Sequence, residues 1–487
     1  MLFNSYIFIF AFLPVTFFVY FYLNKKRLTE AAKGFLVFSS LFFYSWWNII
    51  YLPLILVSML FNYVVGKQLT KVMPDQNHYL KKSLLIIGII SNLALLGYFK
   101  YADFFITNFN RVVDSNIPLL HLALPLAISF FTFQQIAYLV DSYRGQTHEY
   151  DFLNYAVFVA FFPQLIAGPI VHHAEMMPQF ANLRNKVKNY RHIALGLFVF
   201  SIGLFKKVVI ADTFAVWATN GFDVAERLNL IEAWITSLSY TFQLYFDFSG
   251  YTDMAIGAAL LFNIKLPINF SSPYKATSIQ DFWRRWHITL SRFLKGYVYI
   301  PLGGNRHGEI RTYSNLFATF LLGGIWHGAG WTFVFWGALH GLALVIHRAW
   351  HKLGFRMYTF IAWFITFNFI NASWVFFRAK EFEDAIKVLK GMSGMTGINL
   401  PYGLSTKLSF LTQYGVDFGN FIVETGGDTY TFIWLIAGMV FVLAFKNSVE
   451  LANSFKVSYK TMLFSGILFS VGVLSMNKVS EFLYFNF

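Results

Sequence analysis

The chain has 487 residues, of which 57% are hydrophobic and only 13% are charged. Soluble domains carry about 25% charged residues, so this composition excludes an ordinary soluble protein and places the whole chain in a membrane. The net charge of +14 does not indicate nucleic-acid binding, because the basic residues lie in short loops between apolar runs, as in the cytoplasmic loops of membrane proteins.

Apolar runs recur along the chain and predict its membrane spans. The first run, 7–23, follows no basic segment and precedes no small-residue cleavage site, so it predicts a retained transmembrane helix rather than a signal peptide. One crossing needs roughly 20 apolar residues, and the candidates are about 5–23, 34–49, 51–66, 83–99, 117–140, 153–171, 192–205, 208–219, 230–263, 313–347, 357–377, 431–446 and 461–477. Several are too short or too long for one crossing, so we expect about 11–13 segments, some of them re-entrant.

Basic residues between the spans predict the orientation. The clusters at 25–33, 67–82 and 184–191 indicate cytoplasmic loops, which places the N-terminus outside. Three candidate spans separate the second and third clusters where an even number is needed, so we expect 153–171 to enter the membrane and return. The segment 391–430 is rich in Gly and Thr and contains a single basic residue, which predicts an outward-facing loop.

The candidate span 230–263 contains polar side chains at membrane depth, in YTFQLYFDFSGYTDMAIG. Such groups are costly in a bilayer and are often functional. The candidates for a polar pocket are Gln243, Asp247, Ser249, Tyr251 and Asp253. Hydrogen bonding between helices is the alternative, and taken alone these residues favour it.

The segment Asp281–Tyr297 is basic and amphipathic. With residues about 100° apart on a helix, the apolar side chains Phe282, Trp283, Trp286, Leu290, Phe293, Leu294 and Tyr297 form one arc. The opposite arc holds Asp281, Arg284, Arg285, Arg292 and Lys295. This predicts a helix at the cytoplasmic membrane interface, within an amphipathic or re-entrant segment 268–312. The arginines could bind phosphate groups, such as those of coenzyme A, although a simple interfacial anchor explains the pattern too. His287 falls at the boundary of the two arcs.

His327 lies in the middle of the uncharged stretch 313–346 and is surrounded by glycines, in GGIWHGAG. Glycine permits a break in a helix, and a broken helix can open a polar pocket in a membrane. A neutral imidazole there can act as a general base. The alternative is a core histidine that hydrogen-bonds to a neighbouring helix. For His340 we expect this second, structural role.

The sequence lacks the motifs of several common catalytic and binding sites. There is no G-x-S-x-G motif, no H-E-x-x-H motif and no phosphate-binding glycine loop. His172, His173 and Glu175 are a weak metal signal, and cysteine is absent. We therefore predict no metal site and no bound cofactor.

The motifs resemble the membrane-bound O-acyltransferase family, and within it the bacterial branch of alginate O-acetylation. The matching stretches are QLYFDFSGYTDMAIG, INFSSPYKATSIQDFWRRWHITLSRFLKGYVYIPLGGNR and GGIWHGAGWTFVFWGALHG, with weaker matches in FFPQLIAGPI, VDSYRG and MLFNSYIFIF. The resemblance covers nearly the whole chain and is weakest at 390–430.

The resemblance implies a single domain, 1–487, that is all-helical, with helices in a ring around a central tunnel. It implies that His327 is catalytic and that His287 is a second functional position. The donor would be a cytoplasmic acyl thioester, expected to be acetyl-coenzyme A. The donor-binding candidates are Arg284, Arg285, Arg292 and Trp326.

The resemblance also implies a multi-pass protein of the cell's inner membrane that acts on an extracytoplasmic polysaccharide such as alginate. A separate periplasmic protein of the Ser-Asp-His hydrolase type is the expected partner. Peptidoglycan O-acetylation and teichoic-acid D-alanylation are alternatives within the family. A polysaccharide or lipid transporter without acyl chemistry is the alternative outside it, although the inverted repeats common in transporters are not evident in the sequence.

Overall fold

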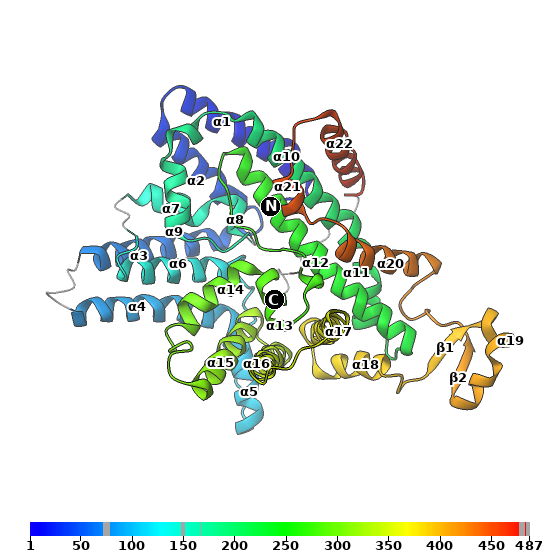
Figure 1. The fold of residues 1–487 in the computed structure, drawn as a ribbon. Coiled ribbons are helices and arrows are strands. Elements are labelled where there is room, and N and C mark those ends of the chain that lie inside the picture. The colour runs from blue at the N-terminus through cyan, green and yellow to red at the C-terminus, as the bar shows by residue number, and fades with distance from the viewer. Residues whose placement is uncertain (72–77, 148–150, 167, 477–482, 484–487) are drawn as a thin grey trace. The chain divides into compact units, whose positions relative to one another are not determined.

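The computed structural model describes residues 1–71, 78–147, 151–166, 168–476 and 483. This described part is almost entirely helical (Figure 1), which confirms the predicted all-α class. Its residues form two compact units. The first comprises Met1–Phe205, Tyr251–Ile268 and Ala452–Asn486, and the second comprises Lys206–Gly250 and Asn269–Leu451.

The first unit is built from the N-terminal helices and the last helix. Its main helices are α1 (Leu13–Lys25), α2 (Thr29–Ser45), α3 (Leu52–Lys71), α4 (His78–Leu96), α5 (Ala102–Val113), α6 (Ile128–Tyr143), α7 (Phe152–Ala160), α8 (Phe162–Leu165), α9 (His173–Ala181), α10 (Tyr190–Phe205) and α22 (Tyr459–Leu474). Helix α1 packs on α2, α3 and α4 pack on α6, and α10 packs on α22. Helix α10 also touches the C-terminal part of α12 (Leu230–Leu261). A Cβ atom on Gly196 would lie 2.7 Å from the carbonyl oxygen of Gly257, so this crossing requires glycine.

The second unit contains the predicted functional segments. Its elements are the first part of α12, with α11 (Asp212–Thr219), α13 (Ile279–Arg285), α14 (Ile288–Leu294), α15 (Glu309–His327), α16 (Trp331–Lys352), α17 (Thr359–Arg378), α18 (Phe382–Met392), β1 (Ile398–Pro401), α19 (Ser405–Leu408), β2 (Val416–Gly419) and α20 (Thr429–Ala444). The short α21 (Ser448–Asn453) precedes the return to the first unit. Helices α15 and α16 form an extensive hairpin, and α16 also packs on α13 and α17.

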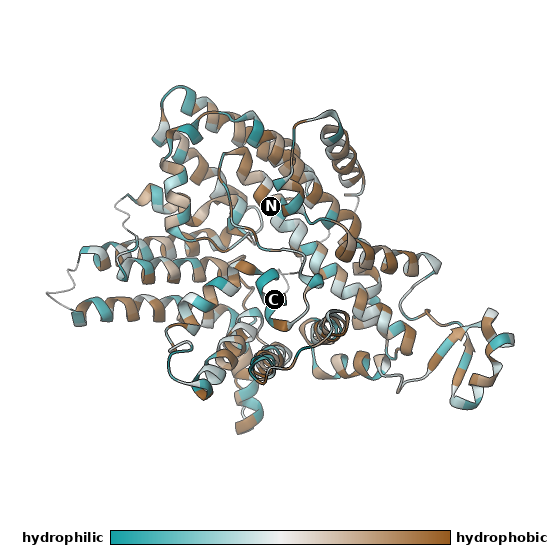
Figure 2. Ribbon diagram, viewed as in Figure 1, coloured by the Kyte–Doolittle hydropathy of each residue, from teal (hydrophilic) through white to brown (hydrophobic). Residues whose placement is uncertain are grey.

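Six helical runs in the described part are long and apolar enough to cross a membrane, and α20 and α22 are shorter apolar helices. The six are Phe8–Lys25, Ile49–Lys71, His78–Val113, Tyr190–Val224, Trp331–Lys352 and Thr359–Arg378. Figure 2 shows the apolar character of α20 and α22 along most of their length. Such runs make the chain a multi-pass membrane protein.

The structure alters several of the predicted span boundaries. The candidates 192–205 and 208–219 are parts of one helical run, Tyr190–Val224, because the two lysines between them continue the helix as a π-helical turn. The long stretch 313–347 divides into α15 and α16 at the glycines, and the predicted re-entrant segment 153–171 begins with two short helices, α7 and α8.

The segment 391–430, predicted as a loop, also contains regular structure. Strands β1 and β2 form a parallel pair in which Ile398 lies opposite Val416. Both strands alternate apolar and polar residues, which is the sequence signal for a half-buried strand. Helix α20, which follows, begins at a reciprocal cap between Asp428 and Thr431.

Candidate active site

His327 is the last residue of α15 and is buried, with 4% of its surface exposed. The next residues leave the helix, since Gly328 and Gly330 have extended backbones, and α16 begins at Trp331. The structure therefore contains the glycine-linked break that the sequence predicts at this histidine.

Glycines allow the two helices beside His327 to touch along their backbones. A Cβ atom on Gly324 would lie 2.4 Å from the carbonyl oxygen of Phe333 and 2.8 Å from Cα of Gly337. A Cβ on Gly328 would lie 2.2 Å from the ring of Phe333. No real Cβ atom approaches so closely, so the hairpin that presents His327 depends on these glycines.

The imidazole of His327 is surrounded by aromatic rings. The ring centroids of Trp326, Trp336 and Phe377 lie 4.9, 5.2 and 5.1 Å from that of His327. Such surroundings leave the ring of His327 little contact with water. A neutral imidazole is the form that can accept a proton from a hydroxyl group.

His287 lies between α13 and α14 with a left-handed backbone, φ 43° and ψ 54°. A non-glycine residue in this conformation costs about 1–3 kcal/mol and is kept only where its surroundings enforce it. The chain therefore does not form the continuous helix predicted over 281–297. The apolar arc is nevertheless real, but it packs within the protein: Phe282, Trp283, Trp286, Leu290, Phe293 and Leu294 are all buried.

Asn269 enforces the position and tautomer of His287. Its Oδ1 atom accepts hydrogen bonds from the backbone N–H and the hydroxyl of Thr289, at 3.2 and 3.0 Å. The same oxygen lies 3.1 Å from Nδ1 of His287, so Nδ1 must carry the hydrogen and Nε2 holds the basic lone pair. His287 is fully buried and outside the six candidate spans, and burial lowers the pKa of its imidazole to about 3.

The structure brings His287 and His327 together. Their ring centroids are 6.4 Å apart, and Trp326 lies beside both, at 6.3 Å from His287. The ring of Phe248, on α12, lies nearly perpendicular to that of His287, with the ring centroids 4.9 Å apart. Two imidazoles that are well separated in the sequence therefore share one aromatic site in the second unit.

His340 has the structural role expected of it. Its Nδ1 accepts a hydrogen bond from the indole N–H of Trp283 at 3.2 Å, and its Nε2 lies 3.1 Å from the hydroxyl of Ser373. Because an indole N–H can only donate, Nε2 carries the hydrogen and donates to Ser373. His340 thereby connects α16 to α13 and α17.

The five pocket candidates on α12 are all buried but do not share one environment. Asp247 forms an ion pair of 2.7 Å with Lys207, and the hydroxyl of Ser249 lies 3.4 Å from Nζ of Lys206. Tyr251 stacks on Phe3 in the first unit. Gln243, in the second unit, and Asp253, in the first, are 7% and 4% exposed.

Two lysines that the sequence analysis missed contact the polar side chains of α12: Lys207 pairs with Asp247, and Lys206 lies near Ser249. Lys206 and Lys207 lie in the π-helical turn Lys206–Ala211 and are at most 9% exposed. Lys207 also pairs with Asp212 at 2.9 Å. Two adjacent lysines within a long apolar run were the available signal, but they entered the sequence analysis only as the boundary between the candidate spans 192–205 and 208–219. π-Helical turns occur often at functional sites.

A cavity of about 710 Å³ lies among α13, α14, α15 and α16. It is lined by four basic side chains, Arg284, Lys295, Arg348 and Lys352, and by one carboxylate, Glu309, together with His347 and His351. Glu309 pairs with Arg348 at 3.3 Å and with Lys352 at 3.6 Å. The excess of positive charge suits an anionic ligand.

Of the four predicted donor-binding residues, only Arg284 lines this cavity. Arg285 is held by Asp281 at 2.9 Å, Arg292 is half-buried on α14, and Trp326 lies beside the two histidines. Among the residues that the structure describes, no group of three or more His, Asp or Glu side chains could hold a metal ion.

Replacing Asn269 with alanine is expected to weaken activity and to lower stability by about 1–3 kcal/mol, because it leaves buried donors of His287 and Thr289 without their acceptor. Asn269→Asp keeps the acceptor and is expected to fold better. Its carboxylate raises the pKa of His287, so activity should fall at a higher pH on the acid side than in the wild type. A pH profile of both variants checks this, and an unchanged acid limb in Asn269→Asp would contradict a functional His287.

Comparison with known proteins identifies the family. Residues 35–378 match the membrane-bound O-acyltransferase family model. The chain is 53% identical to a peptidoglycan O-acetyltransferase of Helicobacter pylori, over 100% of this chain and 98% of the relative. It is 41% identical to a "Probable alginate O-acetylase" of Pseudomonas aeruginosa, over 80% of this chain and 75% of the relative.

A more distant relative is a teichoic acid D-alanyltransferase of Streptococcus thermophilus, 27% identical over 52% of this chain and 68% of the relative. All these relatives are bacterial, which agrees with a location in the inner membrane. The spans, the family match and the named acyltransferases agree with one another. This chain therefore belongs to the membrane-bound O-acyltransferase family and is a multi-pass membrane O-acyltransferase.

Proposed function

We propose that the enzyme transfers an acetyl group from cytoplasmic acetyl-coenzyme A towards peptidoglycan on the outer side of the membrane. The choice of peptidoglycan as the acceptor rests on the similarity to the H. pylori peptidoglycan O-acetyltransferase. This similarity extends over the whole chain, including the region after residue 378, which the family model does not match. Alginate is the second candidate, supported by the P. aeruginosa relative. D-Alanylation of teichoic acid has weaker support.

The basic cavity supports an anionic thioester donor. Its volume of about 710 Å³ falls within the range of roughly 300–1,000 Å³ that is usual for ligand sites. Arg348 and Lys352 would bind the phosphate groups of coenzyme A, with Arg284 and Lys295 on the neighbouring segments. Glu309 would lose its pairing with Arg348 and Lys352 when the donor phosphates bind.

The acyl transfer would use His327 as the general base. Its imidazole removes the proton of the acceptor hydroxyl while the hydroxyl oxygen attacks the thioester carbonyl. The new carbon–oxygen bond forms and the carbon–sulfur bond breaks, and the proton passes from His327 to the departing thiolate of coenzyme A. The products are an acetyl ester and free coenzyme A, so no further reactant is needed.

His287 would orient the donor. With Nδ1 committed to Asn269, its Nε2 atom can accept a hydrogen bond from an amide N–H, and the pantetheine arm of coenzyme A carries such groups. We further propose that a separate extracytoplasmic protein of the Ser-Asp-His type receives the acetyl group and passes it to the polymer.

Arg348→Ala is expected to raise KM for acetyl-coenzyme A by about 10–100-fold with little change in kcat, because it removes a charge-assisted contact that is made before the chemical step. Glu309→Gln should lower KM, since it frees Arg348 and Lys352 from their internal counter-ion. Arg356→Ala, an exposed position beyond the end of α16, is the matched control. Steady-state kinetics in proteoliposomes measures all three, and equal effects of Arg348→Ala and Arg356→Ala would argue against this donor site.

The proposed function is tested in cells that lack the gene and in the purified protein. Loss of base-labile acetyl esters from peptidoglycan, restored by the wild-type gene, is expected. Loss from an exopolysaccharide instead would identify the second candidate. The purified protein should release free coenzyme A in the presence of an acceptor hydroxyl, which a transporter without acyl chemistry would not do.

A further inference from the structure

The segment 402–414, which connects β1 to β2, has six large apolar side chains and buries none of them against the described protein. Tyr402, Phe410 and Tyr414 are 76%, 57% and 74% exposed. The segment consists of helical turns of only three to six residues. Helices this short are unstable in water without a packing surface. Leu408 and Leu411 are partly covered by the protein, whereas the large rings of this segment are left exposed and available to an external surface.

Both ends of the surrounding region are fixed to the beginning of α12. The backbone N–H of Leu230 donates to the carbonyl of Gly397 at 3.0 Å, directly before β1. The carboxylate of Glu232, which is buried, accepts from the backbone N–H of Glu424 at 2.9 Å, after β2. The apolar segment is thus held at a defined place in the second unit.

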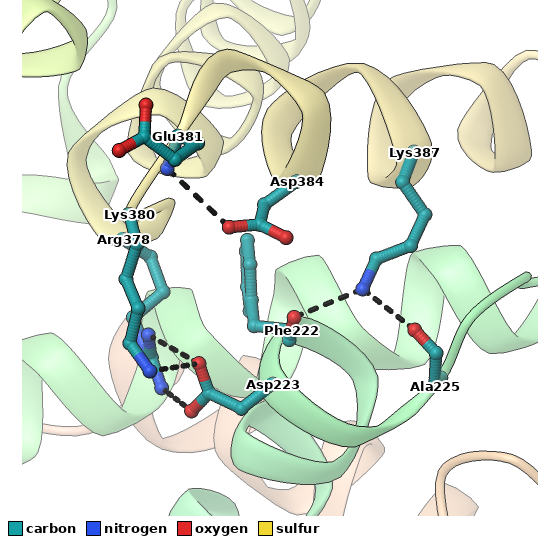
Figure 3. A network of polar contacts seen from close by, with 8 residues as sticks. All are labelled: Phe222, Asp223, Ala225, Arg378, Lys380, Glu381, Asp384 and Lys387. Atoms are coloured by element: carbon teal, nitrogen blue, oxygen red, sulfur yellow. Dashed lines mark hydrogen bonds and ion pairs between the residues drawn. The ribbon is translucent and has the colours of Figure 1, made fainter.

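This place lies at a boundary between membrane and water. Two candidate spans end here, at Val224 and at Arg378, and an ion cluster joins them (Figure 3). Asp223 pairs with Arg378 and, at 3.3 Å, with Lys380. Charged groups at the ends of spans lie at the polar edge of the bilayer, because charge is costly within it. The region 391–426 contacts the chain on both sides of Asp223: the carbonyl of Thr425 accepts a hydrogen bond from Asn220 at 3.0 Å, and a Cβ atom on Gly391 would lie 3.0 Å from the carbonyl oxygen of Leu228.

The composition of 402–414 suits the interfacial layer of lipid. Tyrosine and other amphipathic rings concentrate at the level of the headgroups. Leu404, Phe410 and Leu411 supply apolar surface, while Lys407 is the single charged residue and Ser, Thr and Gln fill the remaining polar positions. A water-soluble partner protein could also bind these rings. Lipid is favoured because two candidate spans end nearby, so the bilayer surface is adjacent to the segment without any partner.

We infer that 402–414 docks on the bilayer surface, with Tyr402, Phe410 and Tyr414 in the headgroup layer, on the side where the spans end at Val224 and Arg378. The lipid surface buries the side chains that the protein leaves exposed. It thereby anchors the small β1–β2 sheet, which lies outside the part of the chain matched by the family model.

The chain contains no cysteine, so single-cysteine spin labels test this directly. Phe410→Cys is labelled in the full-length protein in nanodiscs of phosphatidylethanolamine and phosphatidylglycerol. The label should be relaxed by oxygen and shielded from a water-soluble nickel chelate. Glu383→Cys, an exposed position in the first turn of α18, is the matched control and should show the opposite pattern.

Equal nickel accessibility at 410 and 383 in nanodiscs would overturn the inference. Shielding at 410 that arises only after soluble glycan strands or an extracytoplasmic protein is added would also overturn it, and would identify that molecule as the occupant. Because Phe410 is exposed in the described protein, its substitution should leave the fold intact, which size-exclusion chromatography verifies. The readout does not involve acyl transfer, so it is independent of the proposed function.

Discussion

Replacing His327 with alanine is expected to lower acetyl transfer by about 10²–10⁴-fold, the usual contribution of a positioned general base. The protein should still insert into the membrane, because the aromatic neighbours Trp336 and Phe377 and the glycine contacts of the α15–α16 hairpin remain. His327→Gln keeps a polar side chain of similar size but cannot accept the proton, so it should be nearly as inactive. Release of free coenzyme A by the purified variants measures the effect.

His78→Ala, at the exposed start of α4, is the matched control for loss of an imidazole. Near-normal transfer by His327→Ala would show that another group is the base. A covalent acetyl-imidazole is the other possible use of His327, since histidine can form acyl intermediates. Rapid acid quench during a single turnover would trap acetyl on the wild-type protein in that case and none with a simple base.

Replacing Lys207 with methionine is expected to destabilise the protein by about 3–5 kcal/mol, because it removes the ammonium group that pairs with the buried carboxylate of Asp247. Asp247 is 1% exposed and lies 2.7 Å from the Lys207 ammonium group, so water cannot replace the lost contact. The double variant Lys207→Met with Asp247→Leu should recover much of the loss, since it removes both charges together. Thermal unfolding in detergent compares the wild type with the single and double variants.

Glu30→Gln is the control for an exposed pair, because Glu30 lies at the surface beside Lys33 at 3.0 Å. Its effect should be about 0–1 kcal/mol, as for most surface ion pairs. Equal losses in Lys207→Met and in the double variant would show that the ion pair itself does not account for the stability. Activity measured on folded double variant then reveals whether the pair also serves the reaction.

The two histidines illustrate what a linear pattern can and cannot predict. Glycines around His327 indicate a helix break, and α15 ends there. The amphipathic period around His287 predicts one surface helix, yet the chain bends at His287 and buries it, because Asn269 accepts hydrogen bonds from His287 itself and from Thr289 just after the bend. Periodicity shows which side chains share a helix face, but it does not show which distant residue will hydrogen-bond to the segment and interrupt the helix.

The sequence by itself determined the membrane class, the helical fold, the glycine-linked break at His327 and the structural role of His340, because hydropathy and glycine content act locally along the chain. Only the tertiary structure decided that His287 lies beside His327, that Asn269 sets its tautomer, and that Lys207 meets Asp247. It also assembled the basic cavity from α13 to α16. These contacts join segments that are distant in the sequence, and burial of charge and close packing, rather than any local repeat, select them.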